Sequence, residues 1–340
     1  MIDLLVAGGG PAGLATAIHA ARAGMDVTVV ERRAGVIDKA CGEGLMPHTL
    51  RHLSQLGVDP VGQPLRGISY HDCNRRASAT FEHGSGRGVR RTVLHRALRE
   101  TARAAGVDIV VGDVGEIEQD ETSVRAGQGQ WQARYLAAAD GLHSPIRQSL
   151  GLELPNRGGR RWGIRRHIEA APWSDFVEVH WGFGAEAYVT PVDDGCVGIA
   201  ILTSERGRFD SHLSQFPELL DRISGRPHQP DRAAGPLRQR VANRVSGRVL
   251  LVGDAAGYVD ALTGEGLGLA FGAAKLLVQC IATDNVAAYD QHWRRMTRRY
   301  RALTAGLLSM TSNRAVRSRI VPAAAALPAV FSRAVNLLAD

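Results

Sequence analysis

The strongest constraint on the fold of this chain is a glycine-rich turn, GGGPAG at Gly8 to Gly13. The apolar run before it, 4–7, predicts a buried strand, and the alanine-rich stretch after it, 14–23, predicts a helix. A strand, a glycine turn and a helix in this order form the phosphate-binding unit of dinucleotide-binding folds. In such a unit Gly8 allows the tight turn, Gly10 lets a pyrophosphate approach the backbone, and Gly13 lets the helix pack on the strand.

The residues around this turn predict the kind of nucleotide that it binds. Pro11 and Ala12 begin the helix, whose free N–H groups and positive dipole end favour phosphate. A second predicted strand, 27–30, leads to Glu31, which lies close to the usual spacing of about 20 residues for an acid that binds ribose hydroxyls. An acid there repels a 2′-phosphate, so we expect FAD or NAD at this turn and not NADP.

A second glycine-rich segment, VLLVGDAAGYVDALTGEGLG at Val249 to Gly268, indicates that the resident cofactor is FAD. A predicted strand, 249–252, delivers Asp254, which is expected to accept hydrogen bonds from ribityl or ribose hydroxyls. The glycines after it open a helix that runs to Ala282. A helix N-terminus carries about half a positive charge, which suits the anion that forms at N1 and C2=O of reduced flavin. The predicted contacts here are Gly253, Asp254, Gly264, Gly266 and Leu267.

These segments carry a family resemblance. GGGPAG with Glu31, the dipeptide Asp140-Gly141 and the dipeptide Gly253-Asp254 resemble the three fingerprints of the FAD-dependent monooxygenases of the aromatic-hydroxylase group, and they cover most of the chain. KACGEGLMP at Lys39 to Pro47, together with the second glycine segment, is most similar to the geranylgeranyl-reductase-like flavoproteins. The resemblance therefore implies an FAD enzyme of this superfamily.

The chain departs from the aromatic hydroxylases at three positions. Those enzymes usually have His after GDAA, then Pro, and Asn beyond the last glycine, where this chain has Gly257, Ala261 and Gly268. The departures leave the three FAD fingerprints intact. They weaken the case for straightforward phenol hydroxylation.

The resemblance also assigns further residues to the cofactor. It implies that Arg91 reaches the FAD phosphate and ribityl region, that the backbone of Val114 lies by the adenine, and that Cys41 lies near the isoalloxazine. It implies that Asp140 serves both FAD binding and the approach of a nicotinamide donor, NADH or NADPH. Arg32 and Lys39 complete the predicted cofactor contacts.

The expected fold class is α/β, with a Rossmann-type FAD-binding domain interleaved with a mixed β-sheet substrate domain and followed by a C-terminal helical segment. Helices are predicted at 44–56 and 91–105, and strands at 107–111 and 114–117. Beyond 151 the pattern changes to strands of antiparallel type, which should form a wall over the flavin. The predicted domain ranges are 1–65, 85–155 and 240–300 for FAD, 66–84 and 156–239 for substrate, and 301–340 for the helical segment.

Three residues of these later strands are predicted to line the substrate pocket. Trp181 and Tyr188 belong to an apolar set that suits a small lipophilic or aromatic substrate, and Pro191 is expected to end its strand near the isoalloxazine. His48, His180 and Cys41 are candidates for acid and base chemistry, because the resemblance puts their segments near the flavin. The sequence shows no Ser-His-Asp arrangement and no run of metal ligands.

Composition agrees with such an enzyme. The chain has 340 residues, 44% of them hydrophobic, which is enough for one large core or two coupled domains. Its formal net charge is +7, but the basic residues are spread along the chain and few aromatics lie among them, so nucleic acid is not an expected partner. The four cysteines, Cys41, Cys73, Cys196 and Cys280, form no CxxC pair, so we expect no metal and a reducing compartment.

The two ends of the chain bear on localisation and partners. The chain starts directly in a predicted strand without a basic and apolar leader, which favours the cytoplasm. The apolar tail, 315–338, is interrupted by arginines and by Pro322 and Pro328, so it is too broken to span a bilayer. It is expected to pack on the FAD domain, with contact to a substrate pocket or to the inner face of a membrane as alternatives. The oligomeric state is left open.

The function expected from these observations is an NAD(P)H-dependent monooxygenase. It would form a flavin C4a-hydroperoxide with dioxygen and hydroxylate or epoxidise a lipophilic aromatic or polyketide-like metabolite. One alternative is a geranylgeranyl-reductase-like enzyme that delivers hydride from reduced FAD to isoprenoid double bonds. A third is a flavoprotein that senses a ligand without turnover.

Overall fold

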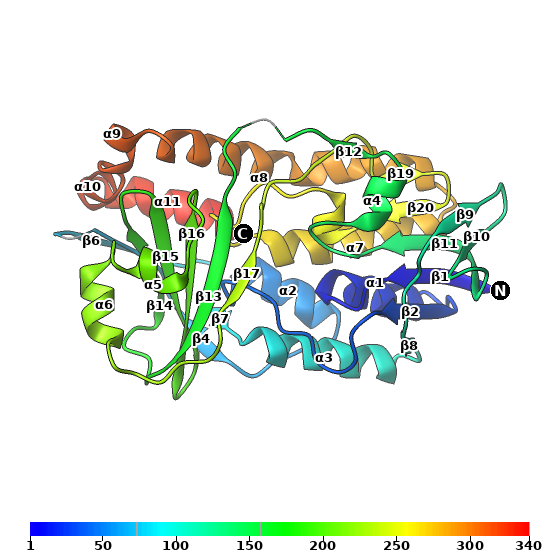
Figure 1. Ribbon diagram of the computed structural model, residues 1–340, viewed down its shortest axis with the longest axis horizontal. Helices are drawn as coiled ribbons and strands as arrows, with labels where there is room; N and C mark the ends of the chain where they lie inside the picture. The colour runs from blue at the N-terminus through cyan, green and yellow to red at the C-terminus, as the bar shows by residue number, and fades with distance from the viewer. Residues whose placement is uncertain (73, 157, 340) are drawn as a thin grey trace.

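The computed structural model describes residues 1–72, 74–156 and 158–339. Cys73 of the cysteine set lies outside the described residues. Two β-sheets lie at opposite ends of the long axis, and a long C-terminal helix, α8 (Tyr289–Thr311), runs along them (Figure 1). The fold class is the expected one, a Rossmann-type α/β arrangement joined to a mixed sheet and C-terminal helices.

The first sheet is the parallel sheet predicted from the glycine turn. Its path is β19-β20-β11-β1-β2-β8, with β10 paired to β11 and β9 to β10. The pairs from β20 through β11, β1 and β2 to β8 are all parallel. Its strands are β1 (Ile2–Ala7), β2 (Val27–Glu31), β8 (Asp108–Val111), β9 (Ile117–Gln119), β10 (Val124–Ala126), β11 (Trp131–Ala138), β19 (Val245–Ser246) and β20 (Val249–Leu251).

Helices cover this sheet on both faces. Consecutive residues Leu4, Leu5 and Val6 of β1 are all fully buried, as expected for a parallel strand with helices above and below it. Leu14 and Phe271 belong to the same core cluster. The elements of this layer are α1 (Pro11–Arg22), α3 (Arg91–Ala104), α4 (Pro145–Ser149), the 3-10 turn η1 (Gly253–Ala256), α7 (Gly266–Ala282) and the 3-10 turn η2 (Val286–Ala288).

The second sheet has the order β17-β13-β16-β15-β14-β5-β6. All its pairs are antiparallel except β5 with β14, which is parallel. Its strands are β5 (Gly67–His71), β6 (Arg76–Thr80), β13 (Trp162–Glu169), β14 (Phe176–Trp181), β15 (Ala185–Asp193), β16 (Cys196–Thr203) and β17 (Arg232–Ala234).

The two faces of this second sheet carry different partners. Ala187 and Val189 of β15 point to the face that packs against α5 (Phe209–Leu213) and α6 (Pro217–Ile223). Successive side chains alternate across a strand, so Glu186 and Tyr188 point to the other face. Tyr188 there donates a hydrogen bond to the carbonyl of Leu262, within the second glycine segment. This other face is therefore the one that meets the FAD fingerprints.

Short elements connect the two sheets around the CGEGL segment. The strands β3 (Gly44–Leu45), β4 (Gln63–Leu65) and β7 (Gly86–Gly88) form a small sheet, and β12 (Glu153–Leu154) pairs with β18 (Arg240–Val241). The predicted helix 44–56 begins later, as α2 (Pro47–Gln55), because Gly44 and Leu45 pair with β7. Pro47 occupies the first helical turn, where its missing N–H costs nothing.

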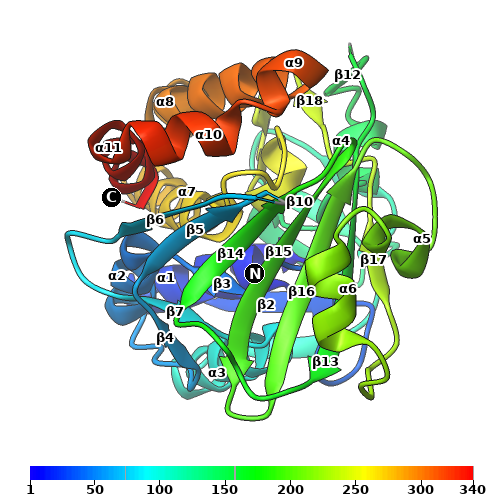
Figure 2. The same ribbon diagram turned by 90° about the vertical axis from the view of Figure 1, so that its left-hand side faces the viewer.

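The C-terminal residues form the predicted helical segment. After α8 come α9 (Arg314–Arg317), α10 (Ile320–Ala326) and α11 (Pro328–Ala339), which lie above β5 and β6 in Figure 2. Ala324, Phe331 and Val335 pack on Ala77 and Ala79 of β6. Across the described ranges, each helix taken alone is too short or too polar for a membrane span, and one pair, Arg314–Ala326 with Pro328–Ala339, meets the length and composition test only across a bend of 106°.

Candidate flavin site and substrate wall

The glycines of the first turn are required by close backbone packing. Gly8 has φ +108°, and a Cβ added there would lie 2.5 Å from the carbonyl oxygen of Ala139 at the end of β11. A Cβ on Gly13 would overlap the carbonyl oxygen of Gly8. A Cβ on Gly10 would meet nothing within 4 Å. The turn is therefore tight on its protein side and open at Gly10, where the approach of a pyrophosphate is predicted.

Glu31 is fixed beside this turn. Its Oε2 accepts a hydrogen bond of 2.8 Å from the N–H of Gly9, and its Oε1 accepts from the backbone and side chain of Arg33. The carboxylate thus bridges the ends of β1 and β2. It lies at the edge of the cleft in which the predicted ribose contact is made.

One cleft brings together eight of the predicted FAD residues. It encloses about 650 Å³ and lies between the ends of β1 and β2 and the segments at 112–115 and 139–146. Val114 lies in a turn and not in the predicted strand 114–117, because Gly115 has φ +56° and β9 begins only at Ile117. The predicted residues that line the cleft are Gly8, Gly10, Glu31, Arg32, Lys39, Arg91, Val114 and Asp140.

Polar atoms in this cleft are left open for a ligand. Oδ2 of Asp140 accepts from the N–H of Ile146, but Oδ1 is buried and has no hydrogen-bond partner among the described residues. Nε of Arg91 is likewise buried and has no hydrogen-bond partner among the described residues. Burial lowers the pKa of Lys39, and the charges of Arg33 and Arg91 lower it further. Buried unsatisfied groups are costly, so a hydroxyl-rich dianion such as the FAD ribose and diphosphate fits this cleft.

The second glycine segment lies on the other side of the same site. Gly253 has φ +65° and Gly264 has φ +71°, which glycine tolerates. Burial raises the pKa of Asp254, and the charges of Arg91 and Lys39 oppose that shift. The predicted contacts Gly266 and Leu267 begin α7 and are half-buried, and the predicted contact Gly264 lies two residues before the helix and is exposed. Pro11 and Ala12 form the start of α1.

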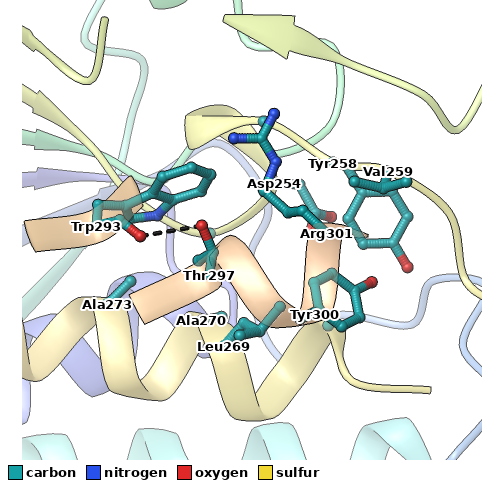
Figure 3. Close-up of a pocket in the computed structure, with 13 residues that line it drawn as sticks. Asp254, Tyr258, Val259, Leu269, Ala270, Ala273, Trp293, Thr297, Tyr300 and Arg301 are labelled. Carbon is teal, nitrogen blue, oxygen red and sulfur yellow. Dashed lines mark hydrogen bonds between the residues drawn. The ribbon is translucent and has the colours of Figure 1, made fainter. Parts of the chain in front are cut away.

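A further pocket of about 410 Å³ lies behind this segment, between α7 and α8 (Figure 3). Gly253, Asp254 and Gly266 contribute to it from the flavin segment. The side chains from the helices include Leu269 and Ala270 of α7, and Trp293, Thr297, Tyr300 and Arg301 of α8.

Glu43 is a central residue that sequence reasoning missed. It is buried with φ +62°, a conformation that few residues other than glycine adopt. Its Oε1 accepts from the N–H of Arg91 at the first turn of α3, and its Oε2 lies 2.6 Å from Nε2 of His167 on β13. Arg165 can only donate to Nδ1 of His167, so the hydrogen on Nε2 points to Glu43. Glu43 thereby ties the CGEGL segment to α3 and to β13 of the second sheet.

His48, a predicted acid-base candidate, pairs with the residue before α7. Its Nε2 lies 3.0 Å from Oε2 of Glu265, and its Nδ1 lies 3.1 Å from the carbonyl of Ala339. Burial alone would lower the pKa of His48, but the hydrogen bond and charge of Glu265 outweigh it and raise that pKa. Burial raises the pKa of Glu265. The pair therefore lies directly at the N-terminus of α7.

The departure from the aromatic hydroxylases at Gly268 has a structural reason. A Cβ at Gly268 would overlap Nε2 of His48 and lie 2.8 Å from Oγ1 of Thr49. Helix α2 packs against α7 at this point. The absence of a side chain at Gly268 is what allows His48 to reach Glu265.

The other two acid-base candidates, Cys41 and His180, lie in different parts of the structure. Burial raises the pKa of the Cys41 thiol, whose sulfur accepts a hydrogen bond of 3.4 Å from the N–H of Glu43. His180 lies on the face of the second sheet that carries α6, opposite Trp181. The structure does not bring His180 to the flavin segments, because strand alternation turns it away from Tyr188. The expectation that His180 lies near the flavin is therefore not met.

Trp181 and Tyr188 form part of an aromatic wall on the face that meets the FAD fingerprints. Tyr70 lies between Trp181, at a ring-centroid distance of 5.3 Å, and Phe331 of α11, at 4.8 Å. Tyr70, Trp181 and Tyr188 are all half-buried. Pro191 lies inside β15 and does not end it, since the strand continues to Asp193 through a register shift.

A buried polar network borders this aromatic wall. Arg161 lies 2.6 Å from Oε2 of Glu186 and 3.3 Å from Oδ2 of Asp260, and Arg317 of α9 lies 2.8 Å from Oε1 of Glu186. Burial raises the pKa of Asp260 to about 6, against the lowering charge of Arg161. Sequence reasoning missed Asp260 and Glu186, because nothing local in the sequence marks their partners.

Comparison with known proteins identifies the family of this chain. Residues 1–286 match the model of a family described as FAD binding domain. Menaquinone reductase from Mycobacterium tuberculosis is 27% identical over 326 residues, which cover 84% of this chain and 78% of that protein. Digeranylgeranylglycerophospholipid reductase 2 from Methanopyrus kandleri is 27% identical over 329 residues, covering 86% and 82%.

A third relative has a different activity in its name. Aurachin C monooxygenase/isomerase from Stigmatella aurantiaca is 26% identical over 316 residues, which cover 83% of this chain and 81% of that protein. Among solved structures, anhydrotetracycline hydroxylase from Streptomyces rimosus superposes with a TM-score of 0.76 at 19% identity, covering 99% of this chain and 75% of that one. The chain therefore belongs to the FAD binding domain family and is an FAD-dependent oxidoreductase.

Proposed function

We propose that this chain is an NAD(P)H-dependent monooxygenase that hydroxylates or epoxidises a lipophilic aromatic or polyketide-like compound. The observation that carries the proposal is the half-buried aromatic wall of Tyr70, Trp181 and Tyr188 beside the buried carboxyl of Asp260. The substrate and dioxygen are consumed with one NAD(P)H and one proton, and the products are the oxygenated substrate, water and NAD(P)+.

The wall supplies the binding chemistry. Aromatic rings favour offset or edge-to-face contact with other rings, and Tyr70 and Trp181 already show this geometry with an interplanar angle of 65°. Tyr188 is fixed by its hydrogen bond to Leu262, so its ring edge is presented at a defined distance from the second glycine segment. These contacts suit a flat apolar substrate and exclude water from its reacting edge.

Asp260 supplies a site for the proton. Its Oδ1 accepts from the N–H of Leu262, which leaves Oδ2, near Arg161, to accept or release a proton. A carboxyl with a pKa of about 6 exchanges protons readily near neutral pH. When bound, FAD supplies hydride acceptance from the nicotinamide and the activation of dioxygen.

Product analysis under labelled oxygen tests the proposal. FAD-loaded enzyme would be supplied with NADH or NADPH, ¹⁸O₂ and a panel of long-chain phenols and naphthols, and the products analysed by mass spectrometry. We expect one ¹⁸O atom in the product per nicotinamide consumed, with Asp260→Asn lowering turnover and retaining FAD. Nicotinamide oxidation that yields only hydrogen peroxide with every compound would contradict the proposal.

A second candidate function is reduction of isoprenoid double bonds. It is favoured by the half-buried thiol of Cys41 within CGEGL, whose pKa burial raises, and two of the relatives are named menaquinone reductase and digeranylgeranylglycerophospholipid reductase 2. Sγ of Cys41 would donate a proton to one carbon as hydride reaches the other. Anaerobic incubation of reduced enzyme with menaquinone or a geranylgeranyl lipid tests this candidate. A product with two added hydrogens, lost in Cys41→Ala, would support it over the monooxygenase.

A further inference from the structure

A histidine pair lies on the second sheet, on the face opposite the aromatic wall. His71 of β5 and His180 of β14 are direct neighbours in the parallel pairing of these strands. Their rings stack with centroids 4.7 Å apart and an interplanar angle of 27°. Both residues are 7% exposed. The pair therefore presents two imidazoles side by side under α6.

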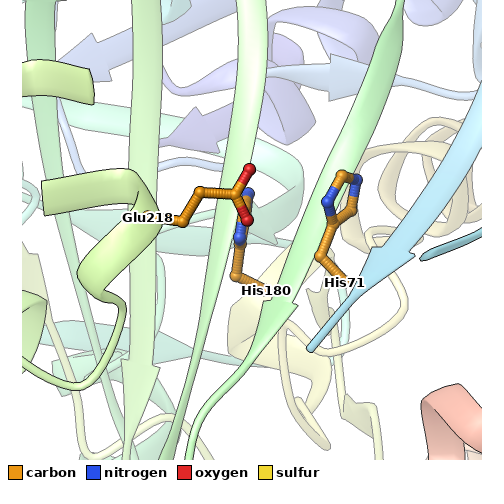
Figure 4. Close-up of side chains that lie close together, drawn as sticks. All are labelled: His71, His180 and Glu218. Carbon is orange, nitrogen blue, oxygen red and sulfur yellow. The ribbon is translucent and has the colours of Figure 1, made fainter. Parts of the chain in front are cut away.

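A carboxylate completes this group. Glu218 lies in the first turn of α6, and its side chain reaches toward both rings (Figure 4). One ligand atom from each of His71, His180 and Glu218 lies within 4.8 Å of the others. Glu218 is exposed and forms an ion pair with Arg222, whose guanidinium lies 3.7 Å away at the solvated surface. Such pairs contribute little, so Glu218 is free to turn to another partner.

Both imidazoles are oriented by hydrogen bonds on one nitrogen. Nε2 of His180 lies 3.2 Å from Oε2 of Glu178, which also accepts from Nε1 of Trp173. Nε2 of His71 lies 2.9 Å from Oγ of Ser69, and Ser69 in turn accepts from Nε of Arg76. Within 1–72, 74–156 and 158–339, Nδ1 of neither ring has a hydrogen bond. Metal-binding histidines are typically held in this way: one ring nitrogen makes a hydrogen bond to the protein, and the other nitrogen binds the metal.

We propose that His71, His180 and Glu218 bind a divalent transition metal ion, with Zn²⁺ as the best match. Two imidazole nitrogens and one carboxylate oxygen, with water in the fourth position, form a common tetrahedral set for Zn²⁺. Such a set places its ligand atoms about 3.3 Å apart. The present spacing of up to 4.8 Å is wider, so binding of the ion requires Glu218 to turn inward and the two rings to shift toward it.

The position of the site indicates what the ion does. It joins β5, β14 and α6, which come from distant parts of the sequence, and it lies on the side of the sheet away from the FAD fingerprints. The ion would therefore fasten α6 to the sheet and take no part in flavin chemistry. This explains why the ligand set has no spacing signature in the sequence.

Calorimetric titration of the FAD-loaded enzyme with ZnCl₂, after treatment with EDTA and dialysis, tests the proposal. We expect one Zn²⁺ per chain, binding weakened at least about tenfold in Glu218→Gln and abolished in His180→Ala. Glu178→Gln, which weakens the contacts of this side chain with His180 and Trp173, should weaken Zn²⁺ binding by about 10–100-fold. His292→Ala, an exposed histidine on α8, is the matched control and should bind as the parent does.

Two results of this titration would overturn the proposed metal site. No binding by the parent enzyme overturns the proposal, and so does binding that is unchanged in Glu218→Gln and His180→Ala. FAD absorbance reports whether each variant is folded. If His180→Ala loses FAD, Glu218→Gln decides alone, because that side chain is exposed and its replacement leaves the sheet intact.

Discussion

At the scale of single residues, the site depends on contacts of two kinds. Gly8, Gly13 and Glu31 act within one strand, turn and strand unit, and the sequence predicts their places because the turn chemistry is local. Glu43 and Asp260 act through His167 and Arg161, which are far away in the chain. No local pattern marks such partners, so these residues could be found only in the folded molecule.

Substitution by alanine should have different effects on stability and FAD binding at two glycines of the first turn. Gly13→Ala places a Cβ on the carbonyl of Gly8 and should destabilise the apoprotein by about 3 kcal/mol. Gly10→Ala has free space and should cost at most about 1 kcal/mol, yet weaken FAD binding because its Cβ projects where the pyrophosphate approaches. Denaturant unfolding of the apoproteins and FAD titration measure the two effects. Equal free energies of unfolding for the two variants would show that the carbonyl of Gly8 leaves room for a Cβ at Gly13.

Asp260 should make stability depend on pH. Its pKa of about 6 in the folded protein lies above the value of about 3.9 for an unfolded Asp. The contribution to stability is therefore complete below about pH 4 and is lost as pH rises through about 6, by up to about 3 kcal/mol. Asp260→Asn should show a smaller fall in melting temperature across this range than the parent, while Asp108→Asn, at an exposed site, should match the parent. If the melting temperature of Asp260→Asn fell with pH as steeply as that of the parent, the raised pKa of Asp260 would be refuted.

At the scale of elements, the predicted and observed structures agree where periodicity and glycine turns are strong. β1, α1 and β2, together with α3 and α7, lie close to their predicted ranges. The prediction fails at Val114, where Asp113 accepts from the N–H of Gly115 to close a turn that apolar content alone does not reveal. It also fails at Gly44, where pairing with β7 overrides helix propensity.

The contact between α2 and α7 allows a paired test. Gly268→Ala should destabilise the protein by about 1–3 kcal/mol, because its Cβ overlaps the ring of His48. His48→Ala removes that ring, so adding Gly268→Ala to it should cost less than in the parent. A double-mutant cycle by denaturant unfolding measures this coupling. Additive effects would indicate that the ring is not what excludes a side chain at Gly268.

At the scale of the whole molecule, the site is assembled by long-range pairing. β5 joins β14 in parallel, and α10 and α11 return from the end of the chain to cover β5 and β6. The sequence predicts the existence of these segments but not their partners, since register between distant strands is decided by packing. For the same reason the sequence predicts that Trp181 and Tyr188 are apolar pocket residues, but it does not predict that they lie beside Tyr70 on one face of the sheet. The identity of the substrate is therefore a proposal.

Contact with a membrane surface also belongs to this scale, and we propose it for the C-terminal helices. Leu327 and Val330 are 57% and 63% exposed, and Arg319 and Arg333 are exposed near them in sequence. Apolar side chains flanked by arginines favour binding to anionic lipid. Flotation with anionic vesicles should recover the parent enzyme at low salt and much less of Leu327→Glu with Val330→Glu. Equal recovery of both proteins, or equal recovery with neutral vesicles, would count against the contact.

The measurement that tests the central claim most directly is stopped-flow reaction of the chemically reduced, FAD-loaded enzyme with dissolved oxygen, with and without lipophilic phenols. A monooxygenase should show a transient absorbance band that matches neither oxidised nor reduced flavin, and its decay should change when substrate is present. Direct reoxidation in a single phase under every condition, with no transient band, would contradict the monooxygenase and favour reduction of double bonds.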